Sequence, residues 1–449
     1  MRMILVDMEI NLRAIKRMAG AIFIGIVLNA CSEKGGIGIF KKQSPHEAYG
    51  QRLKDAGLDR TAMGNKWLLI ADQVIAKPLD INIPYRETGY FAADKAGGTA
   101  LRFTVKRGKK ISIAITKKPA NINIYADLFE LNGTETKRVA FADTTGKPLE
   151  YEVKRDGSYL LRLQPELLIS GEYTLTVTDG PSLGFPVSAS GKPNIGSFWG
   201  VNRDDGTRKH EGIDIFAPKG TPAIAAAGGT VNNVTNNNLG GKVVFFRPDG
   251  KDYTLYYAHL DSQLVQNGQT LKPGDTIGLV GNTGNARNTP SHLHFGIYTS
   301  GGAIDPLAFV DRKITEPPAI TAALNNLNST VRTSNLVNRL YNAPDIKSSQ
   351  TLNLPKNSVL TVEAAASSWY KVRLPDGLIA YISSKSVTDV NVLRSITLKN
   401  AQPLLDAPDS INAPARRQLA AGNKVGVLGA YRNYYLVRDG EEIGWVKEL

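Results

Sequence analysis

From about residue 80 onward, apolar residues recur at every second position in short runs, and this pattern constrains the fold more than any other. The segment 99–116, TALRFTVKRGKKISIAIT, holds two such runs on either side of Gly108. Alternation of this kind is typical of half-buried strands, and frequent Gly, Asp and Pro residues between the runs favour turns. The chain is therefore predicted to be mostly β.

The length of 449 residues predicts several domains, because a single hydrophobic core rarely grows beyond about 250 residues. Residues 45–77 differ from the rest, since their apolar residues lie three to four positions apart, which predicts two short helices interrupted at Gly57. Residues 80–184 are predicted to form a β-sandwich. Its last runs, at 157–177, resemble the closing strands of pre-peptidase-type sandwich domains. A Gly/Pro/Ser-rich boundary then leads into a further β-rich segment, 185–311.

The C-terminal part contains a repeat with an offset of 64 or 65 residues. LYNAPD at 340–345 returns as LLDAPD at 404–409, and WYKVRLPDGLIAYI at 369–382 returns as YYLVRDGEEIGWV at 434–446. A repeat of this length is one small domain per copy. We therefore predict a linker at 312–332 and two domains, at 333–391 and 392–449.

The order of turns and strands in these two copies resembles tandem bacterial SH3-like barrels. That resemblance implies either binding to cell-wall peptides or a spacer role, and the sequence leaves both open.

The lone cysteine, Cys31, excludes an intrachain disulfide bond and follows an uncharged run at 18–30. The run is too short to span a bilayer, but it has the length of a signal-peptide core behind basic residues. Residues 28–31, LNAC, resemble a bacterial lipobox, which implies a signal peptide at 1–30 and lipid on Cys31. Residues 31–79 would then be a tether and the helical segment. The alternative is an uncleaved apolar segment with an incidental thiol.

The formal charge of +13 favours anionic surroundings such as nucleic acid, anionic lipid or an acidic wall polymer. Because the chain has no Arg/Lys run with interleaved aromatic residues, nucleic acid is not a predicted partner. A solvated basic surface would explain the charge equally well. Ser32, after the cysteine, resembles the sorting position of outer-membrane lipoproteins, which implies a lipid-anchored protein of the cell envelope facing the periplasm.

Apart from His46, the histidines gather between positions 210 and 294. His292 and His294 precede an alternating run, so on a strand both imidazoles would project from one face. In the segment HEGID, His210 and Asp214 would share a side if the backbone is extended. Two imidazoles and a carboxylate are suitable Zn²⁺ ligands, and a three-ligand site leaves a position for water. The remaining histidines could act as general base, general acid or oxyanion donors.

Residues 196–306 resemble the lysostaphin-like (LytM-type) zinc metallopeptidases that cut peptidoglycan peptides. The stretches that carry this resemblance are GSFWGVNRDDGTRKHEGIDIFAPKGTPAIAAAGGTV, YYAHLDS, VQNGQTLKPGDTIGLVGNTGNA and SHLHFGIYTSGGAIDPLAF. The resemblance implies a two-sheet, barrel-like β-fold with a groove. It also implies zinc ligands at His210, Asp214 and His294 and catalytic histidines at His259 and His292.

Further residues are candidates for contacts with the substrate. Asn202 and Tyr257 are predicted substrate-binding residues, and Arg203 and Tyr256 are considered beside them. The aromatic pair Phe198–Trp199 could also line the groove, although aromatic residues in β-domains more often belong to the core.

The resemblance implies a zinc-dependent endopeptidase acting on peptide cross-links or stem peptides of peptidoglycan, with a D,D-type bond expected. The alternative is a non-catalytic, wall-binding lipoprotein that activates or scaffolds other wall hydrolases or divisome and envelope proteins. Relatives of that kind lack zinc ligands or catalytic histidines, whereas all five expected residues are present here. The enzyme is therefore the preferred hypothesis.

Overall fold

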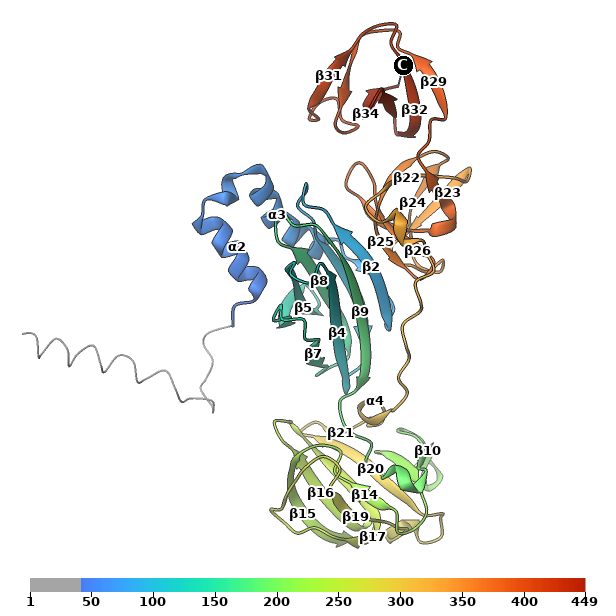
Figure 1. Cartoon of the computed structure of the whole chain (residues 1–449). Helices are drawn as coiled ribbons and strands as arrows, with labels where there is room; N and C mark the ends of the chain where they lie inside the picture. The colour runs from blue at the N-terminus through green and yellow to red at the C-terminus, as the bar shows by residue number, and fades with distance from the viewer. Residues whose placement is uncertain (1–41, 449) are drawn as a thin grey trace, which may run out of the picture. The chain divides into compact units, whose positions relative to one another are not determined.

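The computed structural model describes residues 42–448, so the predicted signal peptide and Cys31 lie outside the described part of the chain (Figure 1). The predicted pair of helices is present as α2 (Pro45–Asp55) and α3 (Ala62–Ala76). Ser44 caps α2 through a capping box, and Gly57 separates the helices with a φ of 71°. Within residues 42–448, no helix is both long and apolar enough to cross a membrane.

The next part of the chain is a β-sandwich of two sheets around one apolar core. One sheet has the order β1-β3-β8-β5-β6, with β1 (Leu79–Asp80), β3 (Thr99–Val105), β8 (Gly157–Pro165), β5 (Ile124–Asn132) and β6 (Glu135–Phe141). The other contains β2 (Tyr85–Phe91), β9 (Gly171–Pro181), β4 (Lys109–Lys118) and β7 (Leu149–Glu152). The two runs flanking Gly108 therefore become strands of opposite sheets, because the turn at its φ of 87° carries the chain across the core.

Helices α2 and α3 pack on the sheet that contains β5 and β8 (Figure 1). Trp67 of α3 and Leu53 of α2 form a small buried cluster with Tyr125 of β5. The Trp67 indole donates a hydrogen bond to the Pro165 carbonyl at 2.7 Å. The helical segment is therefore part of the sandwich domain.

The segment predicted as the third domain is built on one large, strongly curved sheet. Its path is β10 (Asn194–Ser197), β13 (Ile213–Phe216), β20 (His292–Thr299), β17 (Tyr253–Gln263), β16 (Gly241–Pro248), β15 (Gly229–Asn237) and β18 (Thr270–Leu271). Attached to it are β14 (Pro222–Ile224), β19 (Thr276–Val280) and β21 (Gly302–Ile304), while β11 (Asn202–Arg203) and β12 (Arg208–Lys209) form a separate hairpin. A short helix, α4 (Leu307–Val310), ends the segment. Strands β13, β20 and β17 lie side by side and position the histidine and aspartate residues of the candidate site.

The two C-terminal copies are also β-structures. The first copy comprises β22 (Thr330–Thr333), β23 (Val337–Tyr341), β24 (Gln350–Pro355), β25 (Val359–Ala366), β26 (Trp369–Arg373), β27 (Ile379–Ser383) and β28 (Val387–Asp389). The second comprises β29 (Arg394–Thr397), β30 (Gln402–Leu405), β31 (Ala415–Leu419), β32 (Lys424–Tyr431), β33 (Tyr434–Asp439) and β34 (Glu442–Lys447). The prediction of a mostly β, multidomain chain with a short helical N-terminal part is confirmed.

Candidate metal centre and active site

Three side chains converge at the junction of β13 and β20. Asp214 is paired directly with His294 across these strands, and His210 lies just before β13. The atoms Nε2 of His210, Oδ1 of Asp214 and Nδ1 of His294 are each 3.0 Å from the other two. A tetrahedral zinc ion with bonds of about 2.0 Å needs ligand atoms about 3.3 Å apart. The donor set therefore fits a metal ion that caps this triangle.

Glycine at position 212 is explained by the same geometry. A Cβ atom at Gly212 would lie 2.7 Å from Nε2 of the His294 imidazole and 2.6 Å from the Phe295 carbonyl oxygen. Any larger residue would displace the ring that belongs to the triangle. The glycine within HEGID is thus required by the close approach of β20.

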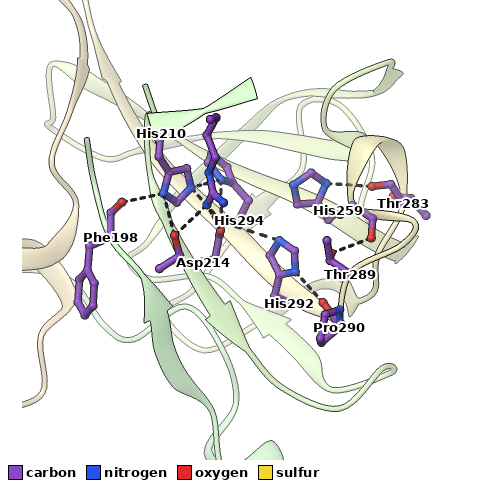
Figure 2. A network of polar contacts seen from close by, with 12 residues as sticks. Phe198, His210, Asp214, His259, Thr283, Thr289, Pro290, His292 and His294 are labelled. Atoms are coloured by element: carbon purple, nitrogen blue, oxygen red, sulfur yellow. Dashed lines mark hydrogen bonds and ion pairs between the residues drawn. The ribbon is translucent and has the colours of Figure 1, made fainter. Parts of the chain in front are cut away.

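The backbone fixes the tautomer of His210. Nδ1 of its ring lies 2.8 Å from the Phe198 carbonyl oxygen (Figure 2). Because a carbonyl only accepts, Nδ1 carries the proton, and the lone pair of Nε2 is directed to the triangle. A partner that orients a histidine in this way is typical of metal sites.

Arg203 orients the carboxylate of Asp214. Its guanidinium donates to Oδ2 of Asp214 at 2.5 Å and to the Ser197 hydroxyl at 2.8 Å. Oδ1 is thereby left to the triangle, while Oδ2 is engaged on the other side. The sequence predicted Arg203 only as a possible rim contact, so this role was missed.

The protonation states suit metal binding. Burial by itself would raise the pKa of Asp214, but the adjacent imidazoles of His210 and His294 hold that pKa well below its ordinary value. Burial also lowers the pKa of His294, against the opposing effect of Asp214. The carboxylate is therefore ionised and His294 is neutral at pH 7, which are the forms that coordinate metals.

His259 of β17 and His292 of β20 lie beside the triangle, with ring centroids 5.0 Å apart (Figure 2). Nδ1 of His259 donates to the Thr283 carbonyl at 2.9 Å, and Nδ1 of His292 donates to the Pro290 carbonyl at 2.8 Å. Each ring thus has a free lone pair at Nε2. Burial, with the unfavourable electrostatic effect of the nearby His294 and His292 imidazoles, lowers the pKa of His259 to about 4, so this ring is neutral near pH 7.

A bulge in β17 brings His259 to the site. Val244 pairs with Tyr257 and Lys242 pairs with Leu260, so Ala258 and His259 face a single residue of β16. His259 has a φ of 61°, in the left-handed region that residues with a Cβ rarely adopt. Bulges next to active sites re-aim side chains, and here the bulge turns His259 out of the core.

The triangle and the two further histidines line a groove of about 660 Å³. One wall is aromatic and consists of Phe245, Tyr256 and Tyr298. The lining also includes Leu239, Asn285, Ala286, Thr289 and Pro290. The site is therefore open to an extended substrate and is not a closed structural centre.

Two predicted substrate contacts do not line this groove. Tyr257 is completely buried in the core, where its hydroxyl accepts a hydrogen bond from the Ala226 amide, so its assignment as a substrate-binding residue is wrong. Its neighbour Tyr256 points into the groove instead. Asn202 is exposed, and its amide oxygen accepts a hydrogen bond from Lys209 at 2.5 Å outside the groove lining.

Comparison with known proteins adds to this geometry. The model of peptidase family M23 matches residues 208–306, and the bacterial SH3 domain model matches residues 334–388. An uncharacterized metalloprotease of Haemophilus influenzae is 44% identical over 101 residues, which are 22% of this chain and 21% of the relative. The uncharacterized lipoprotein YgeR of Escherichia coli is 41% identical over 108 residues, 24% of this chain and 42% of the relative.

A third relative, the peptidoglycan DD-endopeptidase ShyC of Vibrio cholerae, is 39% identical over 94 residues, which are 21% of each chain. The chain thus spans between 21% and 42% of the length of these relatives. Residues 208–306, which match the family model, include His210, Asp214, His259, His292 and His294. Residues 208–306 are therefore similar to peptidase family M23 and are called the M23 domain below, and residues 334–388 are similar to the bacterial SH3 domain.

Proposed function

We propose that this protein is a zinc-dependent endopeptidase that hydrolyses D,D-type peptide cross-links of peptidoglycan. The observation that carries the proposal is the 3.0 Å triangle of His210, Asp214 and His294 at the base of an open groove. The match to the M23 family and the printed name of the relative ShyC support the reaction and the substrate.

The three ligands would hold the metal ion, which in such sites polarises the scissile carbonyl group and lowers the pKa of a water molecule. The imidazoles of His259 and His292 each offer a lone pair at Nε2 beside the triangle, because their Nδ1 atoms donate to backbone carbonyl groups. One of them accepts the proton of the attacking water. As an imidazolium it then donates that proton to the leaving amine, while the other ring orients the reacting groups.

The location that fits this reaction is the cell envelope. The name of the relative YgeR, the bacterial SH3 domain and the LNAC segment support a lipid-anchored protein. Within the proposal, Cys31 carries the lipid and the protein faces the periplasm from the outer membrane. Incorporation of labelled palmitate into the wild type, and its absence from Cys31→Ser, tests the anchor independently of activity.

Digestion of purified peptidoglycan, followed by mass spectrometry of the products, tests the enzymatic proposal. We expect cross-linked dimers to be converted into monomers, with the reaction stopped by a chelator and restored by zinc. Products cut within the stem peptide would replace the D,D assignment but keep the enzyme. Binding to peptidoglycan without any new product would favour the non-catalytic alternative.

A further inference from the structure

We infer that both C-terminal copies are docking modules for the preceding domain of the same chain, and that both use the same face to dock. The first copy docks on the β-sandwich, and the second copy docks on the first. We define the docking face by four equivalent positions, which are Tyr341, Trp369, Lys371 and Tyr381 in the first copy and Leu405, Tyr434, Leu436 and Trp445 in the second. This inference does not depend on the proposed enzymatic activity.

Strand alternation explains why these positions form one face. In β26, Tyr370 and Val372 point into the core of the first copy, so Trp369 and Lys371 point to the other side. In β33, Val437 and Tyr435 belong to the core of the second copy, and Leu436 points away from it. The repeat offset of 64 or 65 residues thus preserves the face as well as the fold.

The face of the first copy is buried by the sandwich. Trp369, Tyr381 and Ala366 belong to the same apolar cluster as the sandwich core, and Trp369 is 8% exposed. The tyrosine hydroxyl of Tyr381 lies 2.9 Å from that of Tyr85 in β2. These aromatic side chains are therefore used within the chain and are not available to a wall peptide.

An ion pair in this interface is fully enclosed. Nζ of Lys371 lies 2.8 and 3.0 Å from the carboxylate oxygens of Glu87, and these side chains are 1% and 0% exposed. The hydroxyls of Tyr85 and Tyr173 donate to the same carboxylate at 2.7 and 2.8 Å. A buried charge of this kind requires its partner, because an unpaired charge would bear the whole desolvation cost.

Backbone contacts continue the same interface. Strand β2 pairs with β25 through Thr88↔Ala365 and Gly89↔Ala364, so one sheet extends from the sandwich into the first copy. Within the turn of the first copy, the amide of Asn342 donates to Asp80 at 2.6 Å.

The second copy repeats the arrangement one domain further along the chain. Tyr434, Leu436 and Trp445 belong to the buried cluster of the first copy, and none of the three is more than 7% exposed. Leu436 and Trp445 share a small cavity with Val359 and Leu360 of the first copy.

Two polar contacts and one close approach fix the second interface. The amide of Ala430 donates to the Asn357 carbonyl at 2.9 Å, and Arg432 donates to Asp376 at 2.7 Å. A Cβ at Gly429 would lie 2.6 Å from a methyl group of Val359, so only glycine permits this approach.

All four positions differ in residue type between the two faces, but only one of them changes from a charged to an uncharged side chain, and this position sets the order of docking. Lys371 in the first copy corresponds to Leu436 in the second, and only the sandwich supplies Glu87 as a partner for the lysine. A leucine opposite Glu87 would leave that carboxylate buried without a cation. The charge therefore assigns the first copy to the sandwich.

The test uses the full chain with a site for a sequence-specific protease placed in the exposed residues 312–316. After cleavage, size-exclusion chromatography at low micromolar concentration reports whether the C-terminal fragment stays bound. We expect the cleaved wild type to elute as one complex. K371E places two carboxylates against each other and should weaken association by roughly 100-fold or more, so that two folded fragments separate. K385E makes the same charge change at an exposed lysine of the first copy and should leave the complex intact.

Separation of the cleaved wild type, or a K371E complex as stable as the wild type, would overturn the inference. If K371E does not fold, Tyr381→Ala serves in its place, because it removes the ring and hydroxyl contacts without introducing a charge. Circular dichroism of the separated fragments distinguishes release from unfolding.

For the second interface, Leu436→Glu should expose the β25 amides of the first copy to hydrogen exchange, whereas Ile411→Glu, at a side chain that is 88% exposed, should not. Unchanged exchange in Leu436→Glu would refute docking of the second copy.

Discussion

Two buried clusters of this chain contain the same three types of side chain, a histidine, an aspartate and an arginine, yet they differ in what they leave free. The cluster in the sandwich comprises His46, Asp127 and Arg162, and the cluster in the M23 domain comprises His210, Asp214 and Arg203. Both place a guanidinium on the carboxylate at 2.5 to 2.7 Å. Residue types alone would therefore identify both or neither as a metal site.

In the sandwich, both ring nitrogens of His46 already have a hydrogen-bond partner. Nε2 of His46 lies 2.7 Å from the Gln164 amide oxygen, and Nδ1 accepts a hydrogen bond from Arg162 at 2.9 Å. The ring also stacks on Trp67 at a centroid distance of 4.7 Å. This histidine packs α2 against the sheet and has no lone pair left for a metal ion.

In the M23 domain, the same types of side chain direct their nitrogen and oxygen atoms to one common position. His210 uses one nitrogen for the backbone, and its other nitrogen meets an aspartate oxygen and a second imidazole nitrogen at 3.0 Å. The difference teaches that converging lone pairs at an open groove, and not the presence of ligand-type residues, mark the candidate metal centre.

The largest expected effect comes from removing a ligand. His210→Ala should lose bound zinc and lower the rate of peptidoglycan hydrolysis by about 1,000-fold or more, because water activation depends on the metal. Metal content after dialysis and product release are the measurements. His46→Gln is the control and should keep both. Full activity in His210→Ala would contradict the assigned site.

The second prediction separates catalysis from metal binding. His259→Ala and His292→Ala should retain zinc but lose roughly 100- to 10,000-fold in turnover, because each removes a proton-transfer group beside the triangle. Zinc content and turnover are measured on the same samples. Loss of metal from His292→Ala would show that the roles of His292 and His294 are exchanged.

The third prediction concerns Arg203, the arginine of the cluster in the M23 domain. Arg203→Met should weaken zinc affinity by about 10- to 100-fold, because Asp214 loses the group that orients it. Competition with a chromophoric chelator measures the affinity without any need for activity. Arg339→Met, at an exposed arginine of the first C-terminal copy, should bind zinc as the wild type does. If the wild type, Arg203→Met and Arg339→Met bind zinc with equal affinity, Arg203 does not orient Asp214 for metal binding.

The smallest expected effect is a pH dependence in the sandwich cluster. Burial, together with Arg162, lowers the pKa of His46 from its ordinary value of 6.5 to about 4. The unfolded chain therefore takes up the proton first as the pH falls, so this stabilisation is fully present above pH 6.5 and is lost towards pH 4. Between pH 7.5 and 5.0 the loss is about 2 kcal/mol.

Native-state hydrogen exchange of the β5 and β8 amides in the intact chain measures the free energy of opening of the sandwich domain, to which His46 contributes. His46→Gln cannot titrate and should show a correspondingly smaller change over the same pH range. An identical pH dependence in the wild type and the variant would mean that His46 contributes nothing to it.

Much of the site was predictable because strand alternation is visible in the sequence. The positions of His292 and His294 two apart predicted a shared direction, and both rings now face the groove. The pairing of Asp214 with His294 could not be derived from alternation, because it depends on the register between β13 and β20. The family resemblance implied these two residues as ligands instead, and residues 208–306 match the model of peptidase family M23.

Other features of the site depend on the tertiary structure and are not visible in the sequence. Tyr257 and His259 have the same parity along β17, but the bulge reverses the direction of His259 and leaves Tyr257 in the core with Leu255. A one-residue irregularity of this kind is not visible in the pattern of the sequence. The contact of Arg203 with Asp214 likewise depends on how the β11–β12 hairpin folds over the site.

Crystals grown with zinc and measured on both sides of the zinc absorption edge would test the central claim most directly. We predict one strong anomalous peak within bonding distance of Nε2 of His210, Oδ1 of Asp214 and Nδ1 of His294, and none beside His46 and Asp127. A peak in the sandwich cluster, or no peak at the triangle in crystals that contain zinc, would contradict this account.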